Sequence, residues 1–277
     1  MARYVTCKVF KNMLSFSYTN VRCAMYYRFS IDDNIWFLRD INSNNYSSIF
    51  ENPYLGFFKG LHEKYGARFQ FNIYYETEGF DLSEMTDRYR DEWRENADWL
   101  RLSFHGRDDI GEPPYMNSSY EEAFEDCQSV HREILRFAGE DTLSYFTTIH
   151  YCQASPEALR AFYDCGLRGL VGLFEDGRYC YQKSYPEFLE PYKYDPESDF
   201  YFFINDMIIN MFSSEGVIPR LEELKHKEFL EVMIHEQYFY PDYPYHQPDF
   251  CCKVEKVVKY LTESGRKSVF LENLLER

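Results

Sequence analysis

The feature that most constrains the fold of this chain is a regular alternation of short apolar segments with amphipathic segments. Predicted strands, rich in aromatic and β-branched residues, lie at residues 25–32, 67–75, 98–105, 143–151, 167–175, 200–206 and 229–239. Predicted helices separate most of them, at residues 53–66, within 81–96, and at 118–140, 155–166 and 218–227, and two more follow at 248–263 and 268–276. Strands that alternate with helices indicate parallel strands joined by helical crossovers. The pattern predicts an α/β barrel, with an open doubly wound sheet as the alternative.

Three predicted helices carry recognisable start or stop signals. Pro53 suits a first helical turn and Gly66 suits a helix end. Ser119 and Glu122 have the spacing of a capping box, and Ser155 suits the residue before a helix. These signals support the helical assignment of the segments that separate the strands.

Composition excludes some classes of function. A chain of 277 residues that is 45% hydrophobic can bury a large core, and we expect residues 1–277 to form one barrel domain. The formal net charge is −16, which repels phosphate backbones and anionic lipid, so nucleic-acid and membrane partners are not expected. The first strand is not followed by a Gly-rich dinucleotide turn, which weakens a nucleotide-binding interpretation.

The sequence favours a cytoplasmic location. The first twenty residues are interrupted by Lys8, Lys11 and Asn12 before a secretory signal could form. No apolar stretch is long enough to span a bilayer. The eight cysteines are scattered without a CxxC pair, and we expect most of them to be reduced thiols.

Acids, histidines and other polar residues gather at the ends of the predicted strands. In strand order they are Asp32 and Asp33, then Tyr74, Tyr75 and Glu76, His105 with Asp108 and Asp109, His150, Glu175 and Asp176, Asn205 and Asp206, and finally His235 and Glu236. A single Asp after a strand is more often a helix cap or a turn residue. In a parallel barrel, however, all these ends meet at one face, where such folds place their sites. The joint pattern therefore predicts a functional site at this face.

The sharpest local signal for chemistry is the segment "SFHGRDD", residues 103–109. His105 and Asp109 are four residues apart across a turn, and Asp33 from the first strand is a candidate third ligand. Imidazole together with carboxylates suits a divalent metal such as zinc, iron, nickel or manganese. We therefore expect a metal site formed by Asp33, His105 and Asp109.

Three short motifs resemble the polysaccharide deacetylase (NodB-homology, carbohydrate esterase) superfamily. They are "FSIDDN", "HGRDD" and "EVMIHE". The resemblance implies a distorted barrel of about seven β/α units, (β/α)7, in which Asp32 is the catalytic base, Asp33 and His105 bind the metal, and His235 is the general acid. The superfamily has a second histidine where this chain has Asp109. The resemblance therefore implies a divergent member, and the added negative charge of Asp109 predicts that iron, manganese or nickel competes better here than in the usual site.

Two motifs of the superfamily are missing or not placed. The Arg-x-Pro-Tyr-type motif is absent from the fourth strand region, where His150 lies. The tryptophan-containing Asp motif that orients the acid histidine is not found, and Asp206 is a stand-in on chain order alone. The aromatic segment 236–250 predicts a lid or a wall for a sugar, with a packed rim loop as the alternative. We accordingly expect His150, Asp206, Tyr238 and Tyr240 to bind substrate.

The function predicted from these residues is a metal-dependent, deacetylase-like hydrolase of an amide or ester bond, acting on an acylated carbohydrate or a related small molecule. The alternative is a non-catalytic barrel that binds a carbohydrate or another ligand, which the missing fourth-strand motif favours. A weaker third interpretation is a metal-free glycosidase that uses Asp32 with Glu76 or Glu236, because two carboxylates at a suitable separation can cleave a glycosidic bond.

Overall fold

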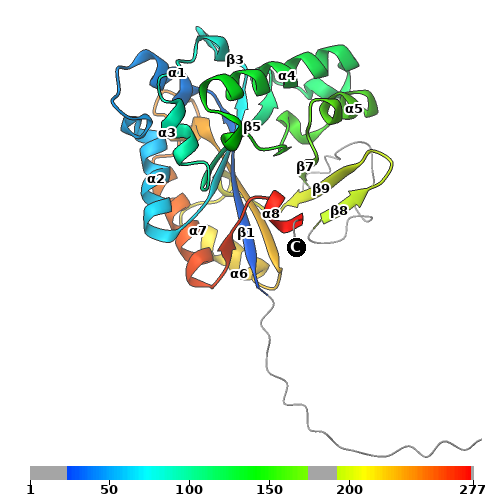
Figure 1. Cartoon of the computed structure of the whole chain (residues 1–277). Helices are drawn as coiled ribbons and strands as arrows, with labels where there is room; N and C mark the ends of the chain where they lie inside the picture. Colours follow the sequence, from blue (N-terminus) through cyan, green and yellow to red (C-terminus); the bar gives the residue numbers. More distant parts are fainter. Residues whose placement is uncertain (1–23, 174–191, 276–277) are drawn as a thin grey trace, which may run out of the picture.

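The computed structural model describes residues 24–173 and 192–275 (Figure 1). Residues 1–23, on which the expectation about a secretory signal rests, lie outside the described residues. Glu175 and Asp176, at the predicted end of the fifth strand, also lie outside them. All five cysteines within the described ranges are free thiols, and they are Cys127, Cys152, Cys165, Cys251 and Cys252.

The strands form two main sheets in which nearly all pairs are parallel. The first has the order β10 (Met207–Ile208), β11 (Phe229–His235), β1 (Tyr26–Asn34), β2 (Phe69–Tyr74), β5 (Leu100–Gly106), and β12 (Lys267–Ser268) also pairs with β1. The second has the order β6 (Phe146–Thr147), β7 (Gly169–Leu173), β9 (Phe200–Asn205), β8 (Tyr192–Asp195). Only β8 runs antiparallel to its neighbour in these two sheets. The fold is thus α/β with a parallel central sheet.

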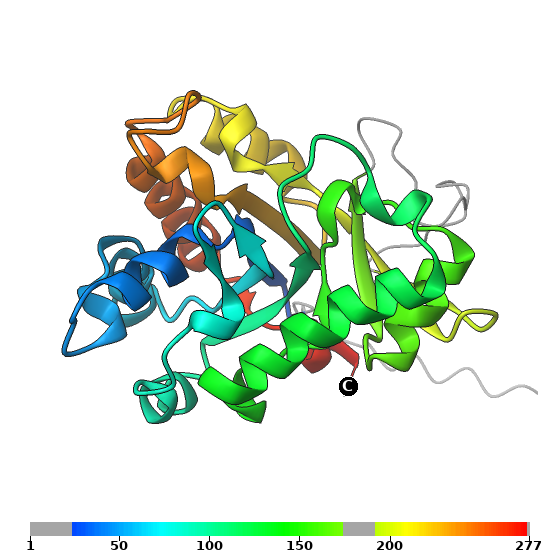
Figure 2. The ribbon, with the colours of Figure 1, turned by 90° about the horizontal axis from the view of Figure 1, so that it is seen from above.

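The two sheets approach each other at both of their edges, in the strand order of a distorted barrel. Between β5 and β6 the contact is a single parallel bridge, Leu102 with Leu143, together with a 2.8 Å hydrogen bond from the Ser144 amide to the Leu102 carbonyl. On the other side β9 runs directly into β10, which pairs with β11. Figure 2 looks onto the end at which β1 finishes and shows helices around the strands.

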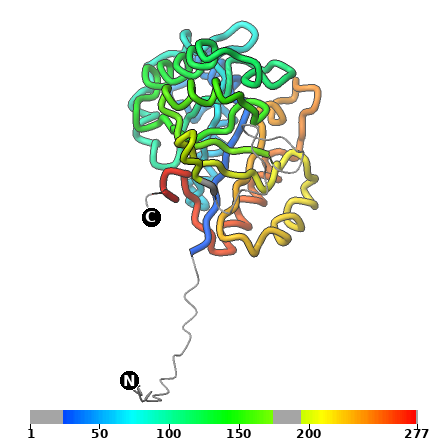
Figure 3. Tube along the Cα trace, turned by 90° about the vertical axis from the view of Figure 1, so that its right-hand side faces the viewer, coloured from blue at the N-terminus to red at the C-terminus, as the bar shows by residue number. Residues whose placement is uncertain are grey.

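The helices follow the strands and cover their outer faces (Figures 1 and 3). They are α1 (Trp36–Ser43), α2 (Pro53–Tyr65), α3 (Arg90–Glu95), α4 (Tyr120–Phe137), α5 (Pro156–Asp164), α6 (Val217–Leu224), α7 (Phe250–Glu263) and α8 (Glu272–Leu275). The predicted caps are present: Ser119 and Glu122 form a capping box, Ser155 accepts the Ala158 amide, and Gly66 ends α2 with φ of +67°. Among the described residues, none of the helices has the length and apolar character needed to cross a bilayer.

Each of the seven predicted strands contains an observed strand. Two predicted segments, one strand and one helix, are wrong over part of their length. The segment 143–151 holds only the two-residue strand β6 and then turns through a 3-10 segment at His150–Cys152. In 268–276 only Glu272–Leu275 is helical. There, β12 pairs with Tyr26 and Tyr27, which precede the first residue of β1 that pairs with β2. The pairing satisfies backbone groups of β1 that would otherwise lack a strand partner.

Side chains along the central strands alternate between an apolar outer face and a polar inner face. Phe69 and Phe71 of β2 pack against Phe58 of α2, with ring centroids 4.9 Å and 5.3 Å from it. The residues between them on the strands point the opposite way, because strand side chains alternate with a period of two. These inner residues are polar and fully buried, and they include Arg28, Ser30, Gln70, Asn72, Ser103, Thr147 and Glu231. The larger apolar core therefore lies between strands and helices, while the inner face of the barrel carries a hydrogen-bonded polar region together with a smaller apolar cluster that contains Phe146, Phe203 and Phe229.

Candidate metal centre

The pair Asp32–Asp33 lies where β1 departs from regular strand geometry. The pairing of β1 with β2 shifts register between Ile31 and Asn34, and Asp33 has φ of +62°. Asp tolerates this left-handed conformation better than most residues. Neighbouring side chains of a regular strand face opposite sides, but the irregularity lets both Asp32 and Asp33 face the same cavity. This explains why an apolar strand ends in two adjacent acids.

Two histidines from other segments converge on Asp33. The Nε2 atom of His105, in β5, lies 2.9 Å from Asp33 Oδ1, and the Nδ1 atom of His150, just after β6, lies 3.7 Å from the same oxygen. The far nitrogen of each ring contacts a backbone carbonyl, Thr148 for His105 and, at 2.8 Å, Ile110 for His150. A carbonyl oxygen can only accept, so these far nitrogens carry the protons. In the neutral form of each ring, the nitrogen that faces Asp33 therefore carries the lone pair that a metal ligand requires.

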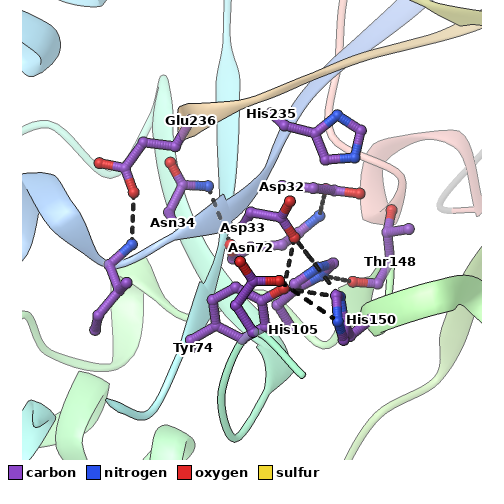
Figure 4. Close-up of polar contacts among 12 residues, drawn as sticks. Asp32, Asp33, Asn34, Asn72, Tyr74, His105, Thr148, His150, His235 and Glu236 are labelled. Carbon is purple, nitrogen blue, oxygen red and sulfur yellow. Dashed lines mark hydrogen bonds and ion pairs between the residues drawn. The ribbon is translucent and has the colours of Figure 1, made fainter. Parts of the chain in front are cut away.

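The donor set fits a divalent cation. Asp33, His105 and His150 each offer one ligand atom, and these three atoms lie within 4.8 Å of one another. Two imidazoles and one carboxylate are a common set for zinc and for iron and other borderline divalent metals. The Tyr74 hydroxyl lies beside them, 2.6 Å from Asp33 Oδ1 and 2.7 Å from His150 Nδ1 (Figure 4). This fit is a property of the side chains alone, and it leaves the identity of the metal open.

The third member of this group differs from the one expected from spacing. Asp109 lies farther out: its side chain is 62% exposed, and its Oδ1 is 3.8 Å from His150 Nε2, the nitrogen that points away from Asp33. His150, expected to bind substrate, instead occupies the position of a ligand. A metal-binding role for Asp109 stays a prediction, and the geometry favours His150 for the third position.

The group opens into a cavity of about 240 Å³. Its polar lining brings together six of the nine residues singled out from sequence, which are Asp32, Asp33, His105, Asp109, His150 and His235. Ile149, Leu173 and Met233 are among the apolar residues that complete the wall. Side chains that are far apart in sequence therefore line one open cavity, as the convergence of parallel strand ends predicts.

Asp32 and His235 are neighbours on adjacent strands at the edge of this cavity. They are directly paired in the register of β1 with β11, and Figure 4 shows the imidazole above Asp32. His235 Nδ1 lies 2.9 Å from the Asn210 side-chain oxygen, so that nitrogen donates and Nε2 is left for other partners. Asp32 is 2% exposed and accepts a hydrogen bond of 2.6 Å from Asn72 Nδ2. Each of the two groups is thus held by an asparagine.

The surroundings of the two adjacent acids push their pKa values apart. Burial raises the pKa of Asp32 above its ordinary value, although His105 and His235 oppose that effect. Burial would also raise the pKa of Asp33, but His235, His105 and His150 together hold it well below the ordinary value. Asp33 is therefore a carboxylate at neutral pH, the form that binds a metal, and the separation of two acids in this way is typical of functional sites.

Among the described residues, the other three predicted substrate ligands do not line this cavity. Asp206 contacts Lys227 Nζ at 2.6 Å and accepts the Glu231 amide at 2.9 Å. Tyr240 donates to Glu236 at 2.9 Å, and the Tyr238 ring is 6.1 Å from that of His235. The residue beside His235 is Asn210, so Asp206 is not positioned to orient the acid histidine.

Sequence reasoning gave no role to three residues of the site, Asn72, Tyr74 and Asn210, although Tyr74 is among the residues at the end of the second predicted strand. A signal for the first two was present in the β2 sequence "FQFNIY", where Gln70, Asn72 and Tyr74 alternate with apolar residues. A period of two of this kind marks one polar face of a strand. Asn210 lies in a 3-10 turn, for which the sequence has no comparable signal.

Comparison with known proteins supports the fold assignment. Neither the protein-family models nor the curated proteins include a match to this chain. Among solved structures, a family 4 acetyl xylan esterase from Clostridium thermocellum, in complex with a cobalt ion, matches with a TM-score of 0.54 and 12% identity, over 91% of this chain and 90% of that chain. A CE4 family pseudoenzyme from Bacillus anthracis matches with a TM-score of 0.51 and 11% identity, over 91% of this chain and 66% of that chain.

The barrel is also shared by a protein with a different printed activity. The 4-alpha-glucanotransferase from Thermococcus litoralis matches with a TM-score of 0.60 and 14% identity, over 92% of this chain and 40% of that chain. At these identities the matches establish the fold, and activity has to be argued from the site. The fold is that of the CE4 deacetylases, and the resemblance seen in three motifs is confirmed at this level.

Proposed function

We propose that this chain is a metal-dependent hydrolase of the deacetylase type, which removes an acyl group from a carbohydrate or a related small molecule by cleaving an amide or ester bond. The observation that carries the proposal is the gathering of three ligand atoms from Asp33, His105 and His150, with Asp32 and His235 beside them. The fold shared with an acetyl xylan esterase that binds cobalt supports it.

The proposed roles follow from the position of each side chain. Asp33, His105 and His150 would hold a divalent metal, zinc or else iron, manganese or nickel. A bound divalent cation polarises a carbonyl group and makes water easier to deprotonate. Asp32, on the other side of the pair, would take the proton of the attacking water, and His235 would give a proton to the departing amine or alcohol. His235 suits the second role because it lies beside Asp32 at the cavity and an imidazole nitrogen can donate a proton.

The size of the cavity and its surroundings support an acyl group as the part of the substrate that enters. A volume of about 240 Å³ is below the range of most small-molecule pockets, so a sugar chain would have to remain outside. Tyr243 lies near the rim residue Tyr238, with ring centroids 5.3 Å apart, and Tyr245 is 69% exposed. We propose that these rings, with Tyr238, contact the sugar.

The metal-free glycosidase interpretation loses both of its partner carboxylates. Glu236 is fully buried, and its carboxylate oxygens accept hydrogen bonds from the backbone amides of Ile35, Trp36 and Phe37. Glu76 forms two hydrogen bonds with Arg107, at 3.0 Å and 3.3 Å. Within the described part of the chain neither glutamate lines the cavity that holds Asp32. The non-catalytic alternative remains a defined second candidate, because a CE4 family pseudoenzyme has this fold.

Metal titration of single-residue variants tests the proposed site. The purified protein is stripped with a chelator and titrated with Zn²⁺ and Co²⁺, and metal content is measured by mass spectrometry. We expect one equivalent to bind, and we expect Asp33→Ala, His105→Ala and His150→Ala each to weaken binding at least 100-fold. Asp109→Ala is the matched control at the rim and should change affinity less than fivefold. If His150→Ala changed the affinity less than fivefold and Asp109→Ala weakened binding at least 100-fold, Asp109 would be the third ligand in place of His150.

Turnover separates the enzyme from the non-catalytic barrel. The metal-loaded protein is assayed for acetate release from N-acetylated chito-oligosaccharides, acetylated xylan and p-nitrophenyl acetate. We expect activity on at least one class, and we expect Asp32→Asn to abolish it while metal affinity stays the same. Tight metal binding without acetate release from any of them would favour the non-catalytic interpretation.

A further inference from the structure

Asn72, in the middle of β2, makes a contact that its position in the fold does not require. Its side chain is fully buried, and its Nδ2 donates a hydrogen bond of 2.6 Å to Asp32 Oδ1. Gln70 Nε2 donates to the Asn72 side-chain oxygen at 2.8 Å, while the Thr147 hydroxyl, 3.3 Å from the same oxygen, donates to the Phe104 carbonyl. The amide is therefore bonded on both sides within the polar interior of the barrel.

These neighbours determine which way the amide faces. An amide oxygen only accepts and an amide nitrogen only donates. Because Gln70 donates to the oxygen of Asn72, the nitrogen of Asn72 has to face Asp32. Gln70 is itself fixed, since its Nε2 also donates to the Phe146 carbonyl at 2.5 Å. The donor directed at Asp32 is thus set by a chain of contacts that starts deeper in the barrel.

A nearby asparagine shows what a purely structural role looks like. Asn34, also fully buried, donates its Nδ2 to the backbone carbonyls of Ile31, at 2.6 Å, and of Asn72, at 3.0 Å, and accepts from Tyr54 at 2.9 Å. Asn34 therefore stabilises the irregular end of β1 through the backbone. Asn72 differs because its side-chain nitrogen goes to a carboxylate that faces the cavity.

We propose that Asn72 is a positioning residue for the reaction, which holds one oxygen of Asp32 so that the other oxygen faces the attacking water. The inference rests on the proposed function. With Oδ1 bonded to Asn72, Oδ2 is the oxygen that takes the proton of the water, while the oxygen of that water forms the new bond to the acyl carbon. The bond from that carbon to the nitrogen or oxygen of the departing group then breaks, and His235 gives that atom its proton. Asn72 touches neither substrate nor metal, and it acts only through the orientation of Asp32. A general base that is displaced by about 1 Å can lose a large part of its effect.

The first arm of the test is kinetic. Asn72→Ala is compared with Ser103→Ala, a matched control that removes another buried interior group, one that donates to the Ser144 carbonyl at 2.9 Å and does not contact Asp32. For Asn72→Ala we expect kcat to fall about 100-fold, with KM and the Zn²⁺ dissociation constant within threefold of wild type. For Ser103→Ala all three should stay within threefold. An unchanged kcat, or a kcat that falls only together with metal affinity, would overturn the proposal.

The second arm needs no turnover. The protein is labelled with ¹⁵N-asparagine, and the side-chain amide signals are recorded by NMR with and without Zn²⁺. We expect one signal with slow solvent exchange that is absent from the Asn72→Ser variant and has a different chemical shift in Asp32→Asn. These two variants also test the proposal if Asn72→Ala fails to fold. A signal with the same chemical shift in Asp32→Asn as in wild type would overturn the contact itself. If wild type shows no turnover, the proposed function fails together with this use of Asn72, while the signal still reports separately on the contact.

Discussion

The most informative prediction concerns Glu236, which joins the end of β11 to the start of α1. One carboxylate oxygen accepts the amides of Ile35, at 2.6 Å, and Trp36, at 3.0 Å, and the other accepts the amide of Phe37 at 2.6 Å. The first residues of a helix have no partner for these amides within the helix. We therefore predict that Glu236→Ala destabilises the protein, because three buried N–H groups lose their acceptor.

The magnitude of this effect depends on pH, and its sign can be worked out. Burial raises the pKa of Glu236 to about 7, against the lowering effect of the backbone amides. The folded protein thus holds this proton more tightly than the unfolded chain does, where the pKa is near 4.5. The free energy of unfolding therefore falls as pH rises from about 4.5 through 7, by about 3 kcal/mol in total and by about 2 kcal/mol between pH 5.5 and 8.

The comparison of wild type with Glu236→Ala isolates this group. Three unmatched amides cost roughly 1–2 kcal/mol each, so the variant should lose about 3–6 kcal/mol at pH 5.5. At pH 8 the free energy of unfolding of wild type is already about 2 kcal/mol lower, because Glu236 is charged while buried. The difference between wild type and Glu236→Ala should therefore be smaller by that amount. Urea unfolding followed by circular dichroism at several pH values gives both numbers.

Tyr240→Phe is the control for this experiment. It removes one hydrogen bond of 2.9 Å to Glu236 and leaves the carboxylate in place, so it should cost about 1 kcal/mol. Because that hydrogen bond lowers the pKa of Glu236, the variant should keep the direction of the wild-type pH dependence and make it somewhat steeper. A gap between wild type and Glu236→Ala that widens as pH rises would refute the reasoning, because it would mean that the backbone amides outweigh burial.

Three further predictions concern other parts of the chain. Ser119→Ala breaks the capping box of α4 and should lower the free energy of unfolding by about 1 kcal/mol, measured by urea titration. Gly169→Ala places a methyl carbon 2.2 Å from the Phe146 ring, and the forced shift should cost about 1–3 kcal/mol in the same assay, whereas Gly60→Ala, where nothing lies within 4 Å, should not destabilise. His235→Gln should lower kcat by about 10²–10⁴ at unchanged Zn²⁺ affinity, and a parallel loss of metal would contradict its role as an acid.

The strands could be predicted from sequence because each is a short run of buried residues between turn signals. The helix α1 was missed for a physical reason: its N-terminal amides are bonded by Glu236, about 200 residues away in sequence, and Ile35 at its start has no side-chain cap. Long-range capping leaves no local signal. The segment 143–151 was misassigned as one strand because its apolar residues are buried by the turn that carries His150 as well as by β6.

The site was predictable in part. The part that was not predictable depends on the backbone conformation of one turn. Asp33 and His105 follow from strand ends that must meet, whatever the loops do. The third ligand depends on the turn after β6, where Tyr151 and Cys152 both have positive φ, at 60° and 54°. Such a conformation is rare for residues other than glycine and is not indicated by these residue types. Spacing within "HGRDD" therefore pointed to Asp109, while tertiary structure brings His150 to the position.

The polar interior of the barrel separates the residues available for chemistry from most of the residues that form the apolar core. The larger apolar cluster lies on the outside of the strands, under the helices, so a change at a polar residue of the inner face removes hydrogen bonds without opening a void in that cluster. Substitutions on this inner face still carry a cost, because Arg28 and Glu231 form a fully buried ion pair there and the loss of either partner would leave the other charge unpaired. A barrel built in this way can lose, regain or exchange its ligands over evolutionary time while its outer shell stays the same.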